Sequence, residues 1–144
     1  MHAFPHRYRV SAAAHPEGEV QLTGEGLPPL ASAAPREFDG PGDRWSPETL
    51  LCAALADCFV LTFRALARAA RLDWTAIECA VEGKLERPVK ESLFTEFRVH
   101  ATLTVPGGSD SARAQQLLEK AERSCLISNS LSATRHLEAS VTVR

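Results

Sequence analysis

The hydrophobic pattern predicts one long core helix in the first half of the chain. From Thr49 to Phe63 the only charged residue is Asp57, and beyond it Arg64, Arg68 and Arg71 follow at spacings of four and three. Such a helix should be buried through most of its length and reach the surface near its end. The sequence Ser46-Pro47-Glu48 predicts its start, because serine caps helices, proline suits the first turn and an acid favours the positive end.

Two segments after this helix alternate with a period of two, which is typical of strands with one buried face. The residues expected to face inward are Ile77, Cys79, Val81 and Leu85 in the first segment, and Phe97, Val99, Ala101, Leu103 and Val105 in the second. Residues 87–92 between them are too many for a two-residue turn, so an exposed loop is expected.

The remaining elements are shorter. Residues 7–10 and 19–23 predict an N-terminal β-hairpin, and a loop rich in proline and glycine spans residues 35–43. A second helix should open at Ser109 and Asp110 and lead to Cys125, followed by a short helix near residues 126–130 and a strand at 137–143. With no internal repeat and no low-complexity segment, residues 1–144 are expected to form a single domain.

Composition and charge exclude several classes of function. The net charge is −2 and no stretch concentrates lysine or arginine, so no nucleic-acid partner is expected. The N-terminus lacks an apolar signal region, and the long helix carries Asp57 and is too short before Arg64 to span a bilayer, so we expect a cytoplasmic protein that uses no membrane. In such a reducing compartment the four cysteines should be free thiols.

The four cysteines have different settings. Cys79 and Cys52 lie in apolar sequence, where a thiol packs as a small hydrophobic group. No pair has Cys-x-x-Cys spacing and the five histidines are scattered, so neither a metal nor another cofactor is expected. Cys58 follows the charged Asp57, whereas Cys125 ends its helix, where the helix dipole opposes a thiolate and favours a resolving role. From these positions alone, a catalytic pair and structural cysteines both stay open.

Two sequence blocks carry a resemblance to a known family. The first is Trp45-Ser46-Pro47-Glu48-Thr49-Leu50-Leu51 followed by Ala53-Ala54-Leu55-Ala56-Asp57-Cys58-Phe59, and the second is Glu122-Arg123-Ser124-Cys125-Leu126-Ile127-Ser128-Asn129-Ser130-Leu131. In this order, and with the loop at residues 35–42, they resemble the OsmC/Ohr family of osmotically inducible and organic hydroperoxide resistance proteins. The resemblance covers roughly the last 110 residues.

The resemblance implies an α+β OsmC-like domain in an intertwined homodimer, with antiparallel sheets wrapped around two long central helices. It further implies a thiol-dependent peroxidase, an organic hydroperoxide reductase of oxidative-stress defence. Cys58 as thiolate would attack the hydroperoxide, become a sulfenic acid and condense with Cys125 to a disulfide. A dithiol would then reduce the disulfide, by analogy with the Ohr branch a lipoylated protein.

The family also places an arginine beside the reactive thiol, oriented by a glutamate that matches Glu48. About ten residues of helix, or ~15 Å, separate Glu48 from Cys58, so the carboxylate would act through an arginine or from the partner subunit. The N-terminal turn that holds this arginine in the Ohr branch has none here, in His15-Pro16-Glu17-Gly18-Glu19. Arg36 is the leading substitute, ahead of Arg7, Arg9 and Arg44. Leu126 also replaces the usual proline, so the chain resembles the broader OsmC-like group.

Alternatives to a peroxidase stay open at this point. The same fold could serve as a non-enzymatic module that binds an apolar small molecule, with the cysteines as core residues. It could also serve as a redox sensor that signals through the disulfide. Phe59 and Phe63, next to Cys58 on the helix, either pack in the core or line a pocket for an apolar hydroperoxide.

Overall fold

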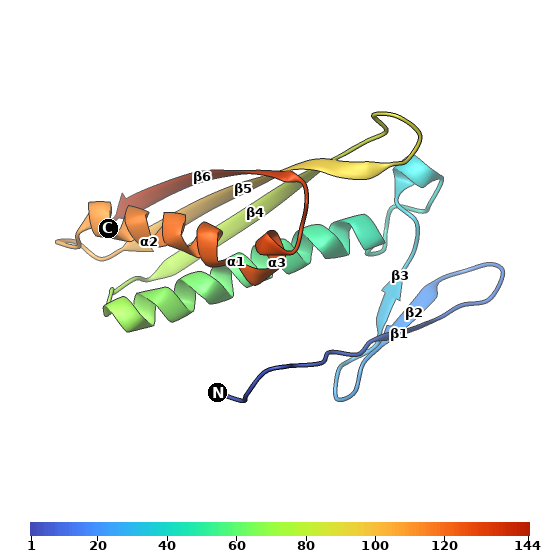
Figure 1. Cartoon of the computed structure of the whole chain (residues 1–144), viewed down its shortest axis with the longest axis horizontal. Helices are drawn as coiled ribbons and strands as arrows, with labels where there is room; N and C mark the ends of the chain where they lie inside the picture. The colour runs from blue at the N-terminus through green and yellow to red at the C-terminus, as the bar shows by residue number, and fades with distance from the viewer. The chain divides into compact units, whose positions relative to one another are not determined.

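The computed structural model describes all residues from 1 to 144 and divides the chain into two compact units (Figure 1). The first unit is Met1–Leu50 and the second is Leu51–Arg144. The long helix α1 (Pro47–Ala70) begins in the first unit and continues through the second. The α+β class predicted from the sequence is confirmed, whereas the single domain over residues 1–144 stays a prediction.

The first unit contains a three-stranded antiparallel sheet in the order β1-β2-β3. Its elements are β1 (Ser11–Ala13), β2 (Val20–Thr23), β3 (Leu30–Ser32) and a 3-10 turn, η1 (Arg36–Phe38). The predicted hairpin is therefore present, but its first strand follows the predicted residues 7–10 instead of coinciding with them. β1 and β3 are short and show no period-two alternation in the sequence. Each is a strand because its backbone pairs with β2.

The start of α1 is a reciprocal cap. The backbone N–H of Thr49 donates to Ser46 Oγ at 3.2 Å, and the N–H of Ser46 donates to Thr49 Oγ1 at 2.8 Å. Two of the amides that a helix start leaves unpaired are thus satisfied, as in a capping box with threonine in the place of glutamate. The predicted start at Ser46-Pro47-Glu48 is confirmed.

The burial of α1 differs from the prediction. Only Leu55, Phe59, Phe63 and Ala67 of this helix are fully buried, all on one stripe, while Leu61 is 49% exposed. The helix is long and apolar enough to cross a membrane, with a mean hydropathy of 1.9 over an 18-residue stretch of which 22% is buried. A core helix meets the same criterion, and the buried stripe joins α1 to the core. The helix nevertheless keeps apolar surface that this chain leaves uncovered.

The second unit is built on a three-stranded sheet in the order β4-β5-β6. The elements are β4 (Ala76–Glu86), β5 (Leu93–Val105), α2 (Ser111–Ser124), α3 (Leu126–Asn129) and β6 (Thr134–Val143). β4 and β5 form the predicted antiparallel hairpin, but β6 pairs parallel to β5, so this sheet is mixed where antiparallel sheets were predicted. The reason is the crossover through α2 and α3, which returns the chain to the end of the sheet where β5 starts.

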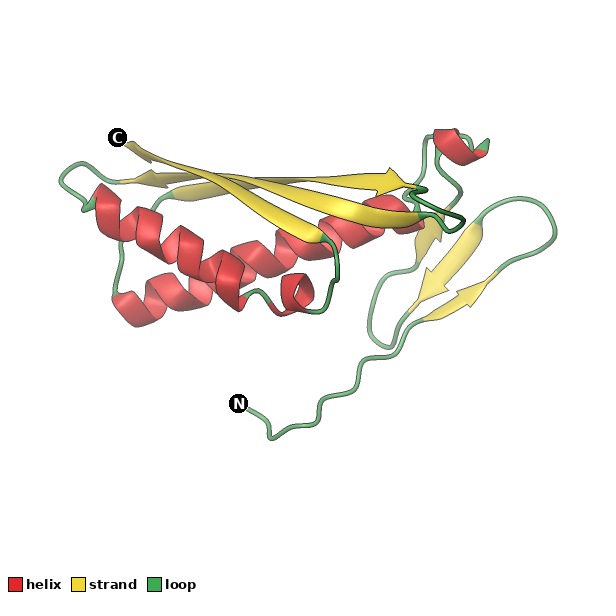
Figure 2. Cartoon of the chain, turned by 45° about the horizontal axis from the view of Figure 1, so that its top comes forward, coloured by secondary structure: helices red, strands yellow, loops and turns green.

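Both long helices of the second unit cover the same face of this sheet (Figure 2). The buried core is drawn from α1, α2, Cys125 and the alternate residues of β5: Phe97, Val99, Ala101, Leu103 and Val105. These are the residues predicted to face inward. Leu85 of β4 was predicted to join them but is 38% exposed, near the end of the strand where the pairing with β5 is irregular and Thr95 is left unpaired.

Candidate active site

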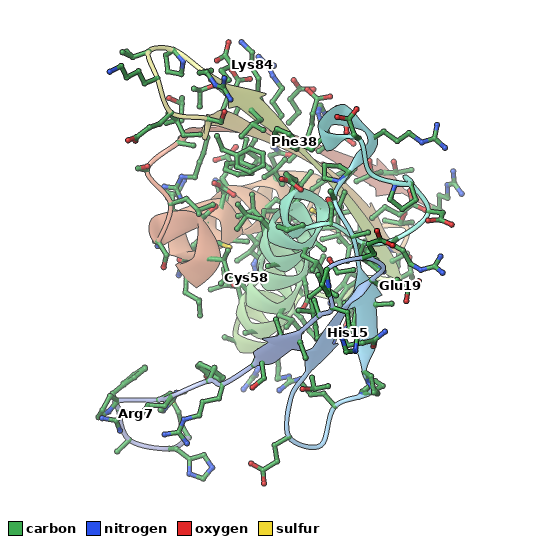
Figure 3. All side chains as sticks on the ribbon, turned by 90° about the vertical axis from the view of Figure 1, so that its right-hand side faces the viewer. Arg7, His15, Glu19, Phe38, Cys58 and Lys84 are labelled. Atoms are coloured by element: carbon green, nitrogen blue, oxygen red, sulfur yellow. The ribbon has the colours of Figure 1, made fainter.

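Cys58 and Cys125 lie together in the second unit. Cys58, labelled in Figure 3, follows the exposed Asp57 on α1, is itself partly buried, and has its sulfur 4.0 Å from Thr62 Oγ1. Cys125 is fully buried at the junction where α2 ends and α3 begins. The Cys58 side chain lies near enough to Cys125 to raise the pKa of the Cys125 thiol. A thiol of α1 and the thiol at the α2–α3 junction therefore lie near each other at the apolar core.

The surroundings of Cys125 favour the protonated thiol. Burial is the largest influence and raises its pKa, and the neighbouring Cys58 raises it further. The backbone amide and the hydroxyl of Ser128 act in the opposite direction. The helix dipole was the cause expected from the sequence, and burial of the thiol acts in the same direction.

The other two cysteines occupy the apolar settings that their sequence predicts. Burial raises the pKa of Cys52, and the backbone amide of Gly83 partly offsets it. Burial, followed by the charge of Glu122 and by Cys125, raises the pKa of Cys79 to about 11. Both cysteines pack against the same hydrophobic core as Cys58, and all four are free thiols in the structure.

The raised pKa of Cys79 predicts slow alkylation in the native protein. Because only the thiolate reacts, the rate with iodoacetamide at pH 8 should be about a hundredfold below that of an ordinary thiol. Between pH 8 and 10 the rate should rise about tenfold per pH unit, since the thiolate fraction grows until the pH reaches the pKa. Peptide mass spectrometry after timed quenching measures this rate, with the urea-unfolded chain as control. Equal rates in the native and unfolded protein would contradict the prediction.

A polar group next to Cys125 was not singled out by sequence reasoning. Ser128, fully buried, donates its hydroxyl to Glu122 Oε1 at 3.1 Å. Arg135 of β6 approaches the same oxygen with Nε at 3.7 Å, while Glu122 Oε2 is buried and has no hydrogen-bond partner. Glu122 lies three residues before Cys125 and Ser128 three after it, on the two helices that meet at Cys125, and this nearness in sequence could have identified both.

The predicted activating residues belong to the first unit. Arg36 lies on η1 with its side chain against Gly42, where any added Cβ would overlap the Arg36 side chain. No ion pair joins Arg36 to Glu48, and Glu48 Oε2 is buried without a hydrogen-bond partner. Arg44 is instead paired with Glu19, Nε to Oε1 2.5 Å, and that hydrogen bond raises the arginine pKa. The roles of Arg36 and Glu48 therefore stay predictions.

The first unit also contains an apolar groove of 520 Å³ that the sequence did not predict. Glu48 is its one charged lining residue, and the others are Ala12, Val20, Leu22, Ser32, Ala33, Ala34, Pro35, Phe38, Pro47 and Leu50. Phe59 and Phe63 are fully buried core residues, which decides between the two roles considered for them. The groove residues are scattered along the sequence, so only folding brings them together.

Comparison with known proteins decides the family. The model of the family described as OsmC-like protein matches residues 40–140. This chain belongs to the OsmC-like protein family. The chain is also 30% identical to the uncharacterized protein YmaD of Bacillus subtilis over 115 residues, covering 76% of this chain and 75% of that protein.

Solved structures of OsmC-like proteins share the fold. An OsmC-like protein of unknown function from Vibrio cholerae is similar with a TM-score of 0.87 at 15% identity, over 94% of this chain and all of that one. An organic hydroperoxide resistance protein OsmC from Legionella pneumophila has a TM-score of 0.76 at 27% identity, over 98% of this chain and all of that one. The family match and the Legionella pneumophila structure support a redox stress role for this OsmC-like protein.

Proposed function

We propose that this OsmC-like protein is a thiol-dependent peroxidase that reduces organic hydroperoxides in the cytoplasm. The proximity of Cys58 and Cys125 carries the proposal, because a thiol that becomes oxidised needs a second thiol within reach to form a disulfide. Of the two, Cys58 is the more exposed and Cys125 is fully buried. Cys58 is therefore the thiol that a peroxide in solution would meet first.

The proposed cycle has three steps. The Cys58 thiolate attacks one oxygen of the peroxide, the O–O bond breaks, and the alcohol leaves with a proton, which leaves Cys58 as sulfenic acid. The thiol of Cys125 then attacks the Cys58 sulfur, forming the S–S bond and releasing water. A dithiol reductant finally exchanges with this disulfide, so that both cysteines return to thiols and the reductant becomes a disulfide.

Two features support an organic hydroperoxide as the substrate. Cys58 packs against the hydrophobic core cluster, so a substrate that reaches its sulfur contacts apolar side chains. Binding of an alkyl or aryl group next to these side chains is favoured because apolar surface leaves water. Hydrogen peroxide has no apolar group and would only lose hydrogen bonds to water. The match to an organic hydroperoxide resistance protein at 27% identity agrees with this substrate class.

We further propose that the active form is a homodimer. Its support is the apolar surface of α1 that the chain leaves uncovered, including Leu61 at 49% exposure. A second copy would cover this surface by packing its own α1 there, as the family resemblance implies. Sedimentation velocity measures the mass directly, and a monomer at micromolar concentration would overturn this part of the proposal.

The proposed activating residues are Arg36 and Glu48. A thiol with an ordinary pKa of ~8.5 is mostly protonated at pH 7, so a cation near Cys58 would favour its thiolate. The buried Oε2 of Glu48 lacks a partner that a guanidinium would supply. Because the helix separates Glu48 from Cys58 of the same chain by ~15 Å, we propose that an arginine bridges them or that Glu48 serves the partner subunit's thiol.

Disulfide mapping after a single oxidation tests the proposed function. One equivalent of cumene hydroperoxide, added to the fully reduced protein, is expected to consume two thiols per chain and to link the peptides of Cys58 and Cys125. The same dose of hydrogen peroxide should react more slowly. Mass spectrometry of the alkylated, unreduced digest identifies the linkage.

The opposite result would move the assignment to another class. If neither peroxide oxidises Cys58 and all four thiols are recovered, the protein is better described as a binding module. If the disulfide forms but a dithiol does not support repeated turnover, a redox sensor is the better description. A linkage that involves Cys52 or Cys79 instead would refute the assignment of the pair.

A further inference from the structure

The polar group formed by Glu122, Ser128 and Arg135 lies where disulfide formation would have to remove a proton. Cys125 and Ser128 are both 0% exposed and occupy one helical turn, in which the Asn129 amide donates to the Cys125 carbonyl at 2.9 Å. The Ser128 hydroxyl reaches Glu122 Oε1 at 3.1 Å. The Glu122 side chain is itself only 13% exposed. A buried hydroxyl that acts on the Cys125 thiol is therefore hydrogen-bonded to a carboxylate that is itself mostly buried.

We propose that Ser128 and Glu122 form a proton relay that activates Cys125 as the resolving nucleophile. Ser128 is the group that meets the thiol, and Glu122 acts through it as a positioning residue and proton acceptor. The inference rests on the proposed function, because it concerns the second step of that cycle.

The chemistry of the step is balanced without a further reagent. The Cys125 thiol gives its proton to Ser128 Oγ as the serine hydroxyl gives its own to Glu122, and the Cys125 sulfur attacks the sulfur of the Cys58 sulfenic acid. The S–S bond forms, the S–O bond breaks, and the departing hydroxide takes up the proton held by Glu122 to become water. The carboxylate is then ready for another cycle.

The need for such a relay follows from the burial of Cys125. Loss of solvent disfavours the thiolate, and a sulfur at 0% exposure loses its proton to bulk water only slowly. Arg135 on β6 holds the Glu122 carboxylate in place. Its Nε lies 3.7 Å from Glu122 Oε1, and its Nη1 donates to Asn129 Oδ1 at 3.1 Å, which fixes the orientation of the guanidinium. Glu122 Oε2 has no partner, so the carboxylate retains an oxygen for an incoming proton. Cys79 on β4 and Cys58 on α1 are the neighbouring titratable groups.

Rapid-quench oxidation separates the relay from the rest of the cycle. Wild type, Glu122→Gln and Ser128→Ala are mixed with one equivalent of cumene hydroperoxide and quenched with dimedone, which labels sulfenic acid. Formation of the Cys58 sulfenic acid should be unchanged in both variants, while disulfide formation slows by about a hundredfold, the lower end of what general-base catalysis contributes. Glu119→Gln, an exposed acid on the same helix, is the matched control and should behave as wild type.

The pH profile separates a proton relay from a structural contribution. In Glu122→Gln the disulfide-forming rate should rise about tenfold per pH unit, because solution base must now generate the Cys125 thiolate, whereas wild type should show a shallower dependence. A rate within twofold of wild type, or parallel profiles, would overturn the relay. If Glu122→Gln does not fold, the rate of disulfide formation in Ser128→Ala, which keeps the Glu122 carboxylate, tests the relay instead. Failure of wild-type Cys58 to become oxidised would refute the proposed function instead.

Discussion

Replacing Cys58 with serine is expected to lower the rate of cumene hydroperoxide consumption by at least about a thousandfold. The remaining rate should equal that of the dithiol alone, because the variant lacks the covalent nucleophile. A serine hydroxyl holds its proton far more tightly than a thiol, and its oxygen does not attack the peroxide oxygen to break the O–O bond. The Cys125 sulfur remains in the variant but is fully buried and largely protonated, so it should not substitute. A coupled assay with dithiol in excess measures the rate.

Cys52→Ala is the control for this substitution, because Cys52 lies on the same helix and its sulfur packs near Gly83 instead of Cys125. It should retain most of the wild-type rate. Circular dichroism of both variants checks that α1 is intact. Substantial turnover by Cys58→Ser would contradict both the nucleophile assignment and the proposed function.

Phe59→Ala is expected to lower the free energy of unfolding by about 3–5 kcal/mol, the range measured for removing a buried phenylalanine side chain. The Phe59 ring is 0% exposed on the stripe of α1 that joins the core. Its loss removes apolar burial and leaves a cavity that the flanking Leu55 and Phe63 cannot fill without moving α1. Urea denaturation of both proteins at one fixed concentration measures the difference, since unfolding of a dimer depends on concentration.

Val89→Ala is the matched control for this stability measurement. Val89 is 88% exposed in the loop between β4 and β5, and its truncation should change the free energy of unfolding by less than about 0.5 kcal/mol. A cost below about 1 kcal/mol for Phe59→Ala would show that the α1 stripe is not packed as described.

Local chemistry made much of the fold predictable. The Ser46 cap and the alternation in β5 are short-range signals, and both occur where the sequence predicts them. The parallel pairing of β6 depends on the path of α2 and α3 across the sheet, which alternation within a strand does not encode. Leu85 is 38% exposed because it lies near the end of β4, where Thr95 is left unpaired on β5, and alternation within β4 does not encode that irregularity.

The candidate site was predictable in the same uneven way. Cys58 and Cys125 were recognisable from their sequence blocks, whereas their proximity required the packing of α1 against the α2–α3 junction. Glu122 resembled any charged residue of a helix, because its burial depends on Ser128 and Arg135 around it. The groove in the first unit combines residues from all three short strands, so no local pattern indicates it.

The parallel pairing of β6 has a consequence for the order of folding. β4 and β5 are joined by a short loop, whereas the β5–β6 ladder aligns Glu96 with Thr134 across a long intervening stretch of chain. Contacts between distant residues form late, since closing the longer loop costs more entropy. During synthesis Cys58 leaves the ribosome before Cys125 and the rest of the crossover exist. If Cys58 and Cys125 act as proposed, a newly made chain oxidised at Cys58 has no resolving thiol and is exposed to irreversible sulfinic acid formation until the crossover has been made and folded.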